Sequence, residues 1–342
     1  MSESRMKVKD IMSGFALYQP GNLTDALALL ERLGSDAWKL AGGNDSLVWF
    51  KERIKQPKAV VDIAGLEELR GIRAIPGGIE IGALTTLTEV ERSPLIREKY
   101  RLLADAARAV ASPQIRHTGT IGGNAAQDAR CPYYRYGLAC YRAGGNICFA
   151  DTPTGVNREH ALFDTVRCVA ASPSDTAPAL VALAAQMVVR SANRERVLTT
   201  DEFFVGPGKD ITRMTALEPN ELLVAIRLPA AWAGCRFYFE KSADRQTWDF
   251  PLVNVAAAIV VENGIIARAR LACGAVSAVP RRLTEAEAVL VGKAPSEALG
   301  REAGAAATRR ARPLTYNGYK IPLMANLVMR AVRDATGGAG DV

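Results

Sequence analysis

Short amphipathic segments follow one another along the first third of the chain, and their apolar spacing predicts alternating helices and strands. Residues 23–33 carry leucine and alanine at helical intervals, with Thr24 placed to cap the start of the helix and Gly34 to end it. Such alternation of brief strands and helices is typical of an α/β region. Apolar runs predict strands at 37–41 and 59–63 and a hairpin from 72–75 to 79–83, and helical patterning covers 86–111.

The apolar pattern changes near residues 228–234, which indicate a connection between two domains. Asn263-Gly264 is the strongest short hairpin signal in the chain and predicts antiparallel strands on either side. An α+β fold is therefore expected, with an α/β region over 1–230 and a smaller α+β domain over 231–342. The other expected elements are a helix at 177–185, strands at 187–190, 235–240, 253–261 and 265–272, and helices at 284–290, 297–309 and 320–335.

Composition narrows the class of protein. The chain has 342 residues, of which 49% are hydrophobic and 23% charged, as in globular proteins. No apolar run reaches the roughly 18 residues that a membrane span needs, and residues 1–7 lack the apolar core of an export signal. The net charge of +7 is scattered and aromatic residues are only 6%, which argues against nucleic-acid binding and leaves a basic surface or an acidic partner subunit.

Two glycine-rich turns are the first candidates for chemistry. Residues 39–47 read Lys-Leu-Ala-Gly-Gly-Asn-Asp-Ser-Leu, and residues 118–124 read Thr-Gly-Thr-Ile-Gly-Gly-Asn. Glycine permits positive φ angles and a close approach, so backbone N–H groups in such turns can bind a phosphate. The first turn lacks the G-x-G-x-x-G dinucleotide fingerprint, and each turn alone is more typical of a plain reversal. Two such turns in one domain favour a shared, elongated anionic cofactor.

Four of the six cysteines, Cys131, Cys140, Cys148 and Cys168, fall in one stretch with the spacing C-x8-C-x7-C-x19-C. Iron–sulfur clusters are commonly held by four thiolates. Structural zinc usually shows C-x₂₋₄-C pairs, which are absent here, and buried unligated thiols are the third interpretation. The glycine-rich spacers suit a loop around a cluster, so the pattern favours iron–sulfur and leaves the other two open. Cys235 and Cys273 lie on or beside expected strands and are expected to be core residues.

Few other residues suggest chemistry. The chain has only two histidines, His117 and His160, so a catalytic triad is not expected. His117 adjoins the second turn and could reach a cofactor or have a structural role, and a hydrogen bond within its loop is expected for His160. Lys241 follows an aromatic strand, where its ammonium could lie beside a cofactor, and Lys320 begins the last expected helix; most lysines are simply solvated. No catalytic acid or base is assigned.

The combined motifs resemble the flavin-binding (medium) subunits of the xanthine dehydrogenase and carbon monoxide dehydrogenase family of molybdenum hydroxylases. The resemblance extends from about Phe15 to Ala335, and this family more often has Thr or His where Asn44 stands. The motifs that carry it together are residues 40–47 (Leu-Ala-Gly-Gly-Asn-Asp-Ser-Leu), 81–83 (Ile-Gly-Ala), 119–124 (Gly-Thr-Ile-Gly-Gly-Asn), 173–175 (Pro-Ser-Asp) and 316–322 (Tyr-Asn-Gly-Tyr-Lys-Ile-Pro).

An insertion of about 40 residues, at roughly 128–172, separates this chain from most of that family. In this it is similar to two branches, the flavin subunits of 4-hydroxybenzoyl-CoA reductase and of bacterial molybdenum aldehyde oxidoreductases, whose loop binds a [4Fe–4S] cluster. Residues 130–134, Arg-Cys-Pro-Tyr-Tyr, look closest to the aldehyde oxidoreductase form. The resemblance thus implies Cys131, Cys140, Cys148 and Cys168 as cluster ligands. Because shorter relatives manage without this loop, its removal is expected to leave the N-terminal fold soluble.

The resemblance also implies the fold and the cofactor. FAD would lie extended between a vanillyl-alcohol-oxidase (PCMH)-type domain of two α/β subdomains and the α+β C-terminal domain. Its pyrophosphate would lie on the two glycine turns, and Asp175 and Lys241 would lie near the ribityl chain or the isoalloxazine ring. The FAD-binding set is then Lys39, Leu40, Ala41, Gly42, Gly43, Asn44, Asp45, Ser46, Leu47, Thr118, Thr120, Gly122, Gly123, Asn124, Asp175 and Lys241.

The same resemblance implies partners: a large molybdopterin subunit and a small subunit with [2Fe–2S] clusters. This chain would pass electrons between the small subunit and an external acceptor or donor, in the cytoplasm, or in the periplasm where a partner carries the export signal. Two other classes of function remain open from the sequence: a self-contained flavin oxidase, and a non-catalytic scaffold with degenerate cofactor sites.

Overall fold

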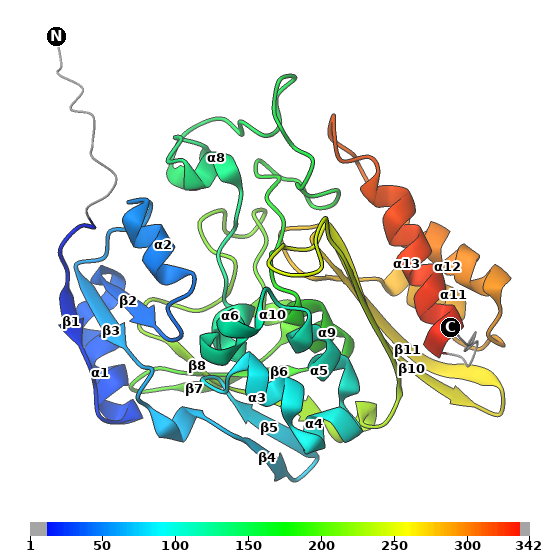
Figure 1. Ribbon diagram of the computed structural model, residues 1–342, viewed down its shortest axis with the longest axis horizontal. Coiled ribbons are helices and arrows are strands. Elements are labelled where there is room, and N and C mark those ends of the chain that lie inside the picture. The colour runs from blue at the N-terminus through cyan, green and yellow to red at the C-terminus, as the bar shows by residue number, and fades with distance from the viewer. Residues whose placement is uncertain (1–11, 336–342) are drawn as a thin grey trace.

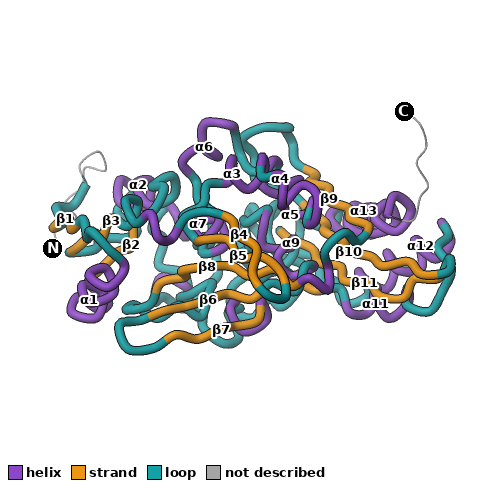
Figure 2. Tube along the Cα trace, turned by 90° about the horizontal axis from the view of Figure 1, so that it is seen from below, coloured by secondary structure: helices purple, strands orange, loops and turns teal. Residues whose placement is uncertain are grey.

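The computed structural model describes residues 12–335, and the expected absence of an export signal at residues 1–7 lies outside them. Three β-sheets follow one another along the long axis of the molecule, with helices packed around them (Figure 1, Figure 2). A small sheet lies at the N-terminal end, a five-stranded sheet in the middle and a four-stranded sheet at the C-terminal end. This order gives the mixed α/β architecture with a separate C-terminal unit that the sequence predicts.

The N-terminal sheet has three parallel strands in the order β1-β3-β2, with α1 packed against it. Asn22, and not Thr24, caps α1: its side chain accepts a hydrogen bond from the Asp25 N–H at 2.9 Å, while Gly34 ends the helix at φ +52°. Asparagine is a stronger cap than threonine, which explains the shift by two residues. The elements here are β1 (Ala16–Tyr18), α1 (Leu23–Leu33), β2 (Ala37–Leu40), α2 (Ser46–Lys51) and β3 (Ala59–Asp62).

The middle sheet is antiparallel, with strands in the order β4-β5-β8-β6-β7. Two of its strands were not predicted: β8 lies at the centre of the sheet and runs into the stretch interpreted as a boundary, and β7 is an exposed edge. The expected hairpin forms from β4 and β5. Residues 86–111 form three helices, of which the second begins at Pro94 with Ser93 as its N-cap. The elements are β4 (Ile72–Ile75), β5 (Gly78–Gly82), α3 (Leu87–Arg92), α4 (Pro94–Lys99), α5 (Arg101–Arg108), α6 (Pro113–Thr118), α7 (Ile121–Ala125), α9 (Thr176–Ala182), β6 (Gln186–Arg190), β7 (Glu195–Thr199), α10 (Thr200–Phe203) and β8 (Leu222–Pro229).

The C-terminal unit pairs a four-stranded antiparallel sheet, in the order β12-β11-β10-β9, with three helices. Asn263 and Gly264 both have positive φ, as a tight hairpin turn requires, and join the two longest strands. All the helices and strands expected beyond residue 235 are found. They are β9 (Arg236–Ser242), β10 (Val253–Glu262), β11 (Ile265–Gly274), β12 (Arg281–Arg282), α11 (Thr284–Leu290), α12 (Glu297–Thr308) and α13 (Lys320–Ala335).

The cysteine-rich insertion has little regular structure beyond the short helix α8 (Pro132–Arg135) and rises between α2 and the C-terminal helices (Figure 1). It is not a detached loop. Tyr134 and Cys140 are buried against Trp49 of α2, and Leu162 and Phe163 belong to the hydrophobic core of the C-terminal unit. The last third of the loop thus fills part of another domain's core, and the solubility of the N-terminal fold without the loop stays a prediction. Among residues 12–335, no helix is both long and apolar enough to cross a membrane.

Candidate functional site

Both glycine turns border one cavity of about 370 Å³, which lies within the size range of small-molecule sites. The N-terminal sheet, α6, α7 and the C-terminal unit all contribute to its wall. Of the residues expected to bind a cofactor, those on the wall are Lys39, Ala41, Gly42, Gly43, Asn44, Asp45, Ser46, Thr120, Gly123 and Asn124.

The first turn follows β2 and touches the second directly. A Cβ atom on Gly42 would lie 2.1 Å from the Thr118 carbonyl oxygen, so only glycine fits there. Asn44 holds the two turns together, because its Nδ2 donates to Thr118 Oγ1 at 3.0 Å and to the Ile115 carbonyl at 3.3 Å. Gly43 has φ +76°, and the side chains of Leu40 and Leu47 flank it. Leu40, Leu47 and Thr118 therefore contact residues of the first turn but do not line the cavity themselves.

The second turn is the start of a helix and not an open loop. Thr120 caps α7, accepting a hydrogen bond from the Gly123 N–H at 3.1 Å. Gly122 faces away from the cavity and packs against Ala83, where a Cβ would lie 2.8 Å from both its Cβ and its carbonyl oxygen. The Asn124 carboxamide oxygen accepts from Ser174 at 2.7 Å and from Thr176 at 2.6 Å. Residues from three segments therefore fix this side of the cavity.

Asp175 and Lys241 lie together, but one layer behind the cavity wall. Lys241 Nζ donates to Asp175 Oδ2 at 2.7 Å and to the Ala109 carbonyl at 2.9 Å. Asn254 Nδ2 donates to the other Asp175 oxygen at 3.0 Å. Burial raises the pKa of Asp175 to about 6, and the Lys241 charge opposes that rise. This buried network joins the two domains and supports Val110, which lines the cavity.

The charged side chains on the wall already have partners. Lys39 donates to the Glu218 carbonyl at 3.0 Å, and burial lowers its pKa to about 8. Arg130 bonds Asp45 at 2.5 Å and lies over the Phe250 ring, 4.5 Å from its centroid. Asp128 pairs with Lys55 at 3.2 Å and with Arg142.

The aromatic residues on the wall were missed because nothing in their local sequence marks them. Trp248 and Phe250 reach the cavity from the β9–β10 loop, more than a hundred residues from the glycine turns. Trp248 has φ +76°, is 61% exposed, and its backbone N–H donates to the Ala111 carbonyl at 2.9 Å. Only the tertiary fold brings this loop to the site.

The four clustered cysteines are all free thiols in one region beside the cavity. Cys131 and Cys168 pack on the same small apolar group, Ala129, Ala170 and Met214. Burial raises the pKa of Cys131 to about 11, against the lowering effect of backbone hydrogen bonds at Tyr134 and Tyr133. Burial also raises the pKa of Cys168. Cys131 packs as well against the hydrophobic cluster that contains Cys140, and Phe149, next to Cys148, packs on that cluster too, so the insertion gathers the four cysteines in one region.

No three His, Cys, Asp or Glu side chains within residues 12–335 are arranged to hold a single metal ion. A tetrahedral zinc at about 2.3 Å from each sulfur would require sulfurs about 3.8 Å apart, so a zinc site is not formed. In a cubane [4Fe–4S] cluster each iron binds only one cysteine thiolate, so the cysteine sulfurs lie farther apart than around a single zinc ion. Four unpaired cysteines gathered in one region are the set of ligands that such a cluster takes.

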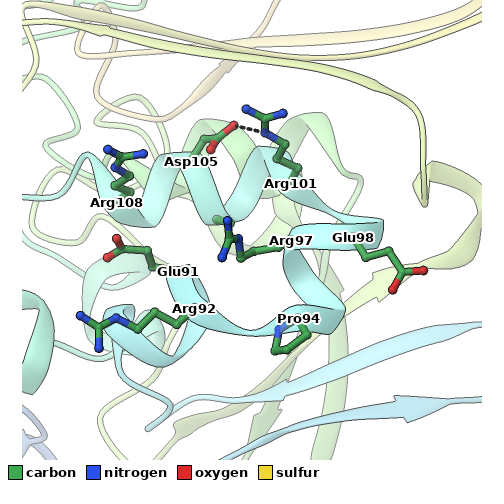
Figure 3. A pocket seen from close by; sticks show the side chains of 9 residues that line it. Glu91, Arg92, Pro94, Arg97, Glu98, Arg101, Asp105 and Arg108 are labelled. Atoms are coloured by element: carbon green, nitrogen blue, oxygen red, sulfur yellow. Dashed lines mark ion pairs between the residues drawn. The ribbon is translucent and has the colours of Figure 1, made fainter.

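A second concavity, of about 820 Å³, lies on the surface of α3, α4 and α5 and contains no residue of either glycine turn (Figure 3). Its arginines and carboxylates alternate, with Arg101 bonded to Asp105 at 3.3 Å and Glu91 to Arg116 at 3.1 Å. The Arg97 side chain extends over the middle of the groove in Figure 3, while Glu98 points away from it. This groove is polar and open, in contrast to the mostly apolar cavity between the turns.

Comparison with known proteins decides the family. The family described as the FAD binding domain in molybdopterin dehydrogenase matches residues 13–231, and the CO dehydrogenase flavoprotein C-terminal domain matches residues 237–335. The chain belongs to this flavoprotein family. It is 31% identical to the carbon monoxide dehydrogenase medium chain of Hydrogenophaga pseudoflava over 94% of this chain and 96% of that one.

Two further comparisons agree. The aldehyde oxidoreductase FAD-binding subunit of Escherichia coli is 34% identical, over 80% of this chain and 85% of that one. A solved structure of carbon monoxide dehydrogenase from H. pseudoflava superposes with a TM-score of 0.76 at 30% identity, covering 95% of this chain and 98% of that chain. The flavoprotein described here is therefore an FAD-binding subunit of an oxidoreductase, with the fold that its sequence predicts.

Proposed function

We propose that this flavoprotein is the FAD and [4Fe–4S] electron-transfer subunit of a heterotrimeric molybdenum hydroxylase. One observation carries the proposal: residues 128–131 belong to both candidate sites. Asp128 and Arg130 line the cavity, and Cys131 belongs to the thiol group. Neighbouring Cα atoms are about 3.8 Å apart, so a cofactor in the cavity and a cluster on the thiols would be close neighbours.

The residues of the cavity suit FAD. The first turn offers the backbone N–H groups of Gly42 and Gly43 to a pyrophosphate. Asn44 ties the first turn to the second, and Thr120 fixes the second turn by capping α7. The Asp175–Lys241 pair braces the wall beside Val110 from behind, through the Ala109 carbonyl. Bound FAD would exchange single electrons with iron–sulfur clusters and electron pairs with an acceptor.

The wall lacks an uncommitted acid or base, which supports electron transfer over a self-contained oxidase. The ionisable side chains on the wall are Lys39, Asp45, Asp128 and Arg130, and each is held by a hydrogen bond or an ion pair. General acid–base catalysis needs a group free to exchange a proton with the substrate. Substrate chemistry is accordingly assigned to the large molybdopterin subunit, with a small [2Fe–2S] subunit passing electrons to this chain.

The names of the relatives support such partners, since they describe a medium chain and an FAD-binding subunit. The likeness to an aldehyde oxidoreductase subunit, together with the cysteine insertion, favours that kind of complex over a 4-hydroxybenzoyl-CoA reductase. An affinity-tagged flavoprotein expressed with its neighbouring subunits should therefore co-purify with molybdenum. A tagged chain that purifies alone and oxidises a substrate by itself would favour the oxidase instead.

Cys140→Ser tests the two-site arrangement. Cys140 is 8% exposed and does not line the flavin cavity, so the variant should lose most of its iron and retain its FAD. Cys235→Ser is the matched control, because Cys235 lies outside the insertion and should keep both. Loss of iron and FAD in equal measure from Cys140→Ser would contradict separate sites, and full iron retention would contradict the assignment of this thiol.

A further inference from the structure

His160 lies directly against one of the four thiols. Its Nε2 is 3.3 Å from the Cys131 sulfur, within hydrogen-bonding range for sulfur. The side chain is only 4% exposed, and its other ring nitrogen, Nδ1, is buried without a hydrogen-bond partner. Buried polar atoms are rarely left unpaired in folded proteins, so this arrangement needs an explanation.

The thiolate decides the tautomer. A neutral imidazole has one N–H donor and one acceptor nitrogen. A cysteine that ligates iron has lost its proton and can only accept a hydrogen bond. A hydrogen bond between Nε2 and a cluster-bound Cys131 therefore requires the proton on Nε2, which leaves Nδ1 as the bare nitrogen.

The C-terminal unit holds His160 in place independently of the thiols. Asn317 Nδ2 donates to the carbonyls of His160 and Ala161 at 3.0 and 3.1 Å. Lys320 Nζ donates to the preceding carbonyl, that of Glu159, at 2.9 Å. The ring thus belongs to a rigid, preformed support and can impose its orientation on Cys131.

We propose that His160 is a positioning residue for the cluster, donating an Nε2–H···S hydrogen bond to Cys131 that raises the cluster's reduction potential. This rests on the proposed function, since it requires a cluster on the four thiols. Hydrogen bonds to cluster sulfurs are among the factors that set cluster potentials. A donor stabilises the reduced state more than the oxidised one, because the reduced cluster places more negative charge on its sulfurs.

The test compares His160→Leu, His160→Gln and, as a matched control, His117→Leu. Leucine removes the donor, whereas the glutamine Nε2 can occupy nearly the same place as the imidazole Nε2. His117 is exposed and lies on α6, outside the insertion. Iron and FAD contents are measured on each purified complex, and the cluster's midpoint potential is followed by electron paramagnetic resonance during a redox titration.

We expect a lower midpoint potential in His160→Leu, with His160→Gln and His117→Leu close to the unmodified protein. An unchanged potential in an iron-replete His160→Leu variant overturns the proposal, as does an equal fall in His160→Gln. If His160→Leu has a lower iron content, iron retention in His160→Gln supports the hydrogen bond. Equal loss of iron from the two variants refutes the hydrogen bond. Unmodified protein without iron refutes the cluster itself, which separates that failure from a failure of His160.

Discussion

Replacing Gly42 by alanine should separate the two glycine turns and weaken FAD binding. The added Cβ would lie 2.1 Å from the Thr118 carbonyl oxygen and 2.8 Å from its carbon. Since carbon–oxygen contacts in proteins are about 3.3 Å or longer, the second turn must move by about 1 Å. Both partners are backbone atoms, so no side chain can rotate away to relieve the clash.

The magnitude follows from the cost of overpacking. Forcing an extra carbon into a packed site costs about 1–3 kcal/mol, and part of that strain is relieved only by opening the cavity. Every 1.4 kcal/mol lost from binding is tenfold in affinity, so FAD should bind roughly 10- to 100-fold more weakly. Gly43→Ala meets no atom closer than 3.8 Å and adds only the strain of φ +76°, so its effect should be smaller.

The assay is titration of the flavin-free protein with FAD, followed by flavin fluorescence, with Gly65→Ala as control. Gly65 has open space around the Cβ position and no left-handed φ. The reasoning predicts the order Gly65→Ala, Gly43→Ala, Gly42→Ala for increasing dissociation constant. Native affinity in Gly42→Ala, with a native circular dichroism spectrum, would refute the claim that contact between the turns shapes the site.

Three other changes test the supports of the site. Asn44→Ala removes the hydrogen bonds of the first turn to Thr118 and to the Ile115 carbonyl of α6. At about 1 kcal/mol each, their loss should weaken FAD binding by up to roughly 30-fold in the same titration; unchanged affinity would contradict that link. Asn317→Ala leaves three backbone groups without their hydrogen-bond partner. The free energy of unfolding, measured in urea, should fall by about 3 kcal/mol, and the iron content should fall as well. A fall below about 1 kcal/mol would contradict the anchoring role of Asn317. Burial lowers the pKa of Lys320 from 10.5 to about 8. Between pH 8 and 10 the lysine is protonated in the unfolded protein and mostly neutral in the folded protein. The free energy of unfolding should therefore rise by roughly 2–3 kcal/mol from pH 8 to 10. Lys320→Met should lack that rise, and parallel curves for the two proteins would show that Lys320 is not the group responsible.

Local signals in the sequence were sufficient for much of the fold. The hairpin at Asn263-Gly264 and the three C-terminal helices depend on turn chemistry and helical spacing, which act within a few residues. The strand β8 was missed because its pattern is apolar except for Arg227, without alternation, and ends in Leu228-Pro229, next to a stretch that resembles a linker. Its place at the centre of the sheet is set by pairing with β5 and β6, both distant in sequence.

The candidate site also combines residues that their local sequence marks with residues that only the tertiary fold brings to the site. Gly42, Gly43 and Thr120 carry the signal in their own turns, and the structure places all three on one cavity. Asp175 and Lys241 form a buried interdomain pair behind the wall, and their place near the flavin stays a prediction. A charge pair so deeply buried needs the hydrogen bonds that Asn254 and the Ala109 carbonyl supply, and no local pattern marks those partners. Trp248 and His160 gain their roles only through contacts across the fold.

The most direct test of the account is anomalous X-ray diffraction at the iron absorption edge from crystals of the purified complex. The account predicts FAD density between the two glycine turns and, in the same chain, an iron peak enclosed by Cys131, Cys140, Cys148 and Cys168, with His160 against the first of them. An FAD-bound chain whose four thiols show no iron signal would contradict it.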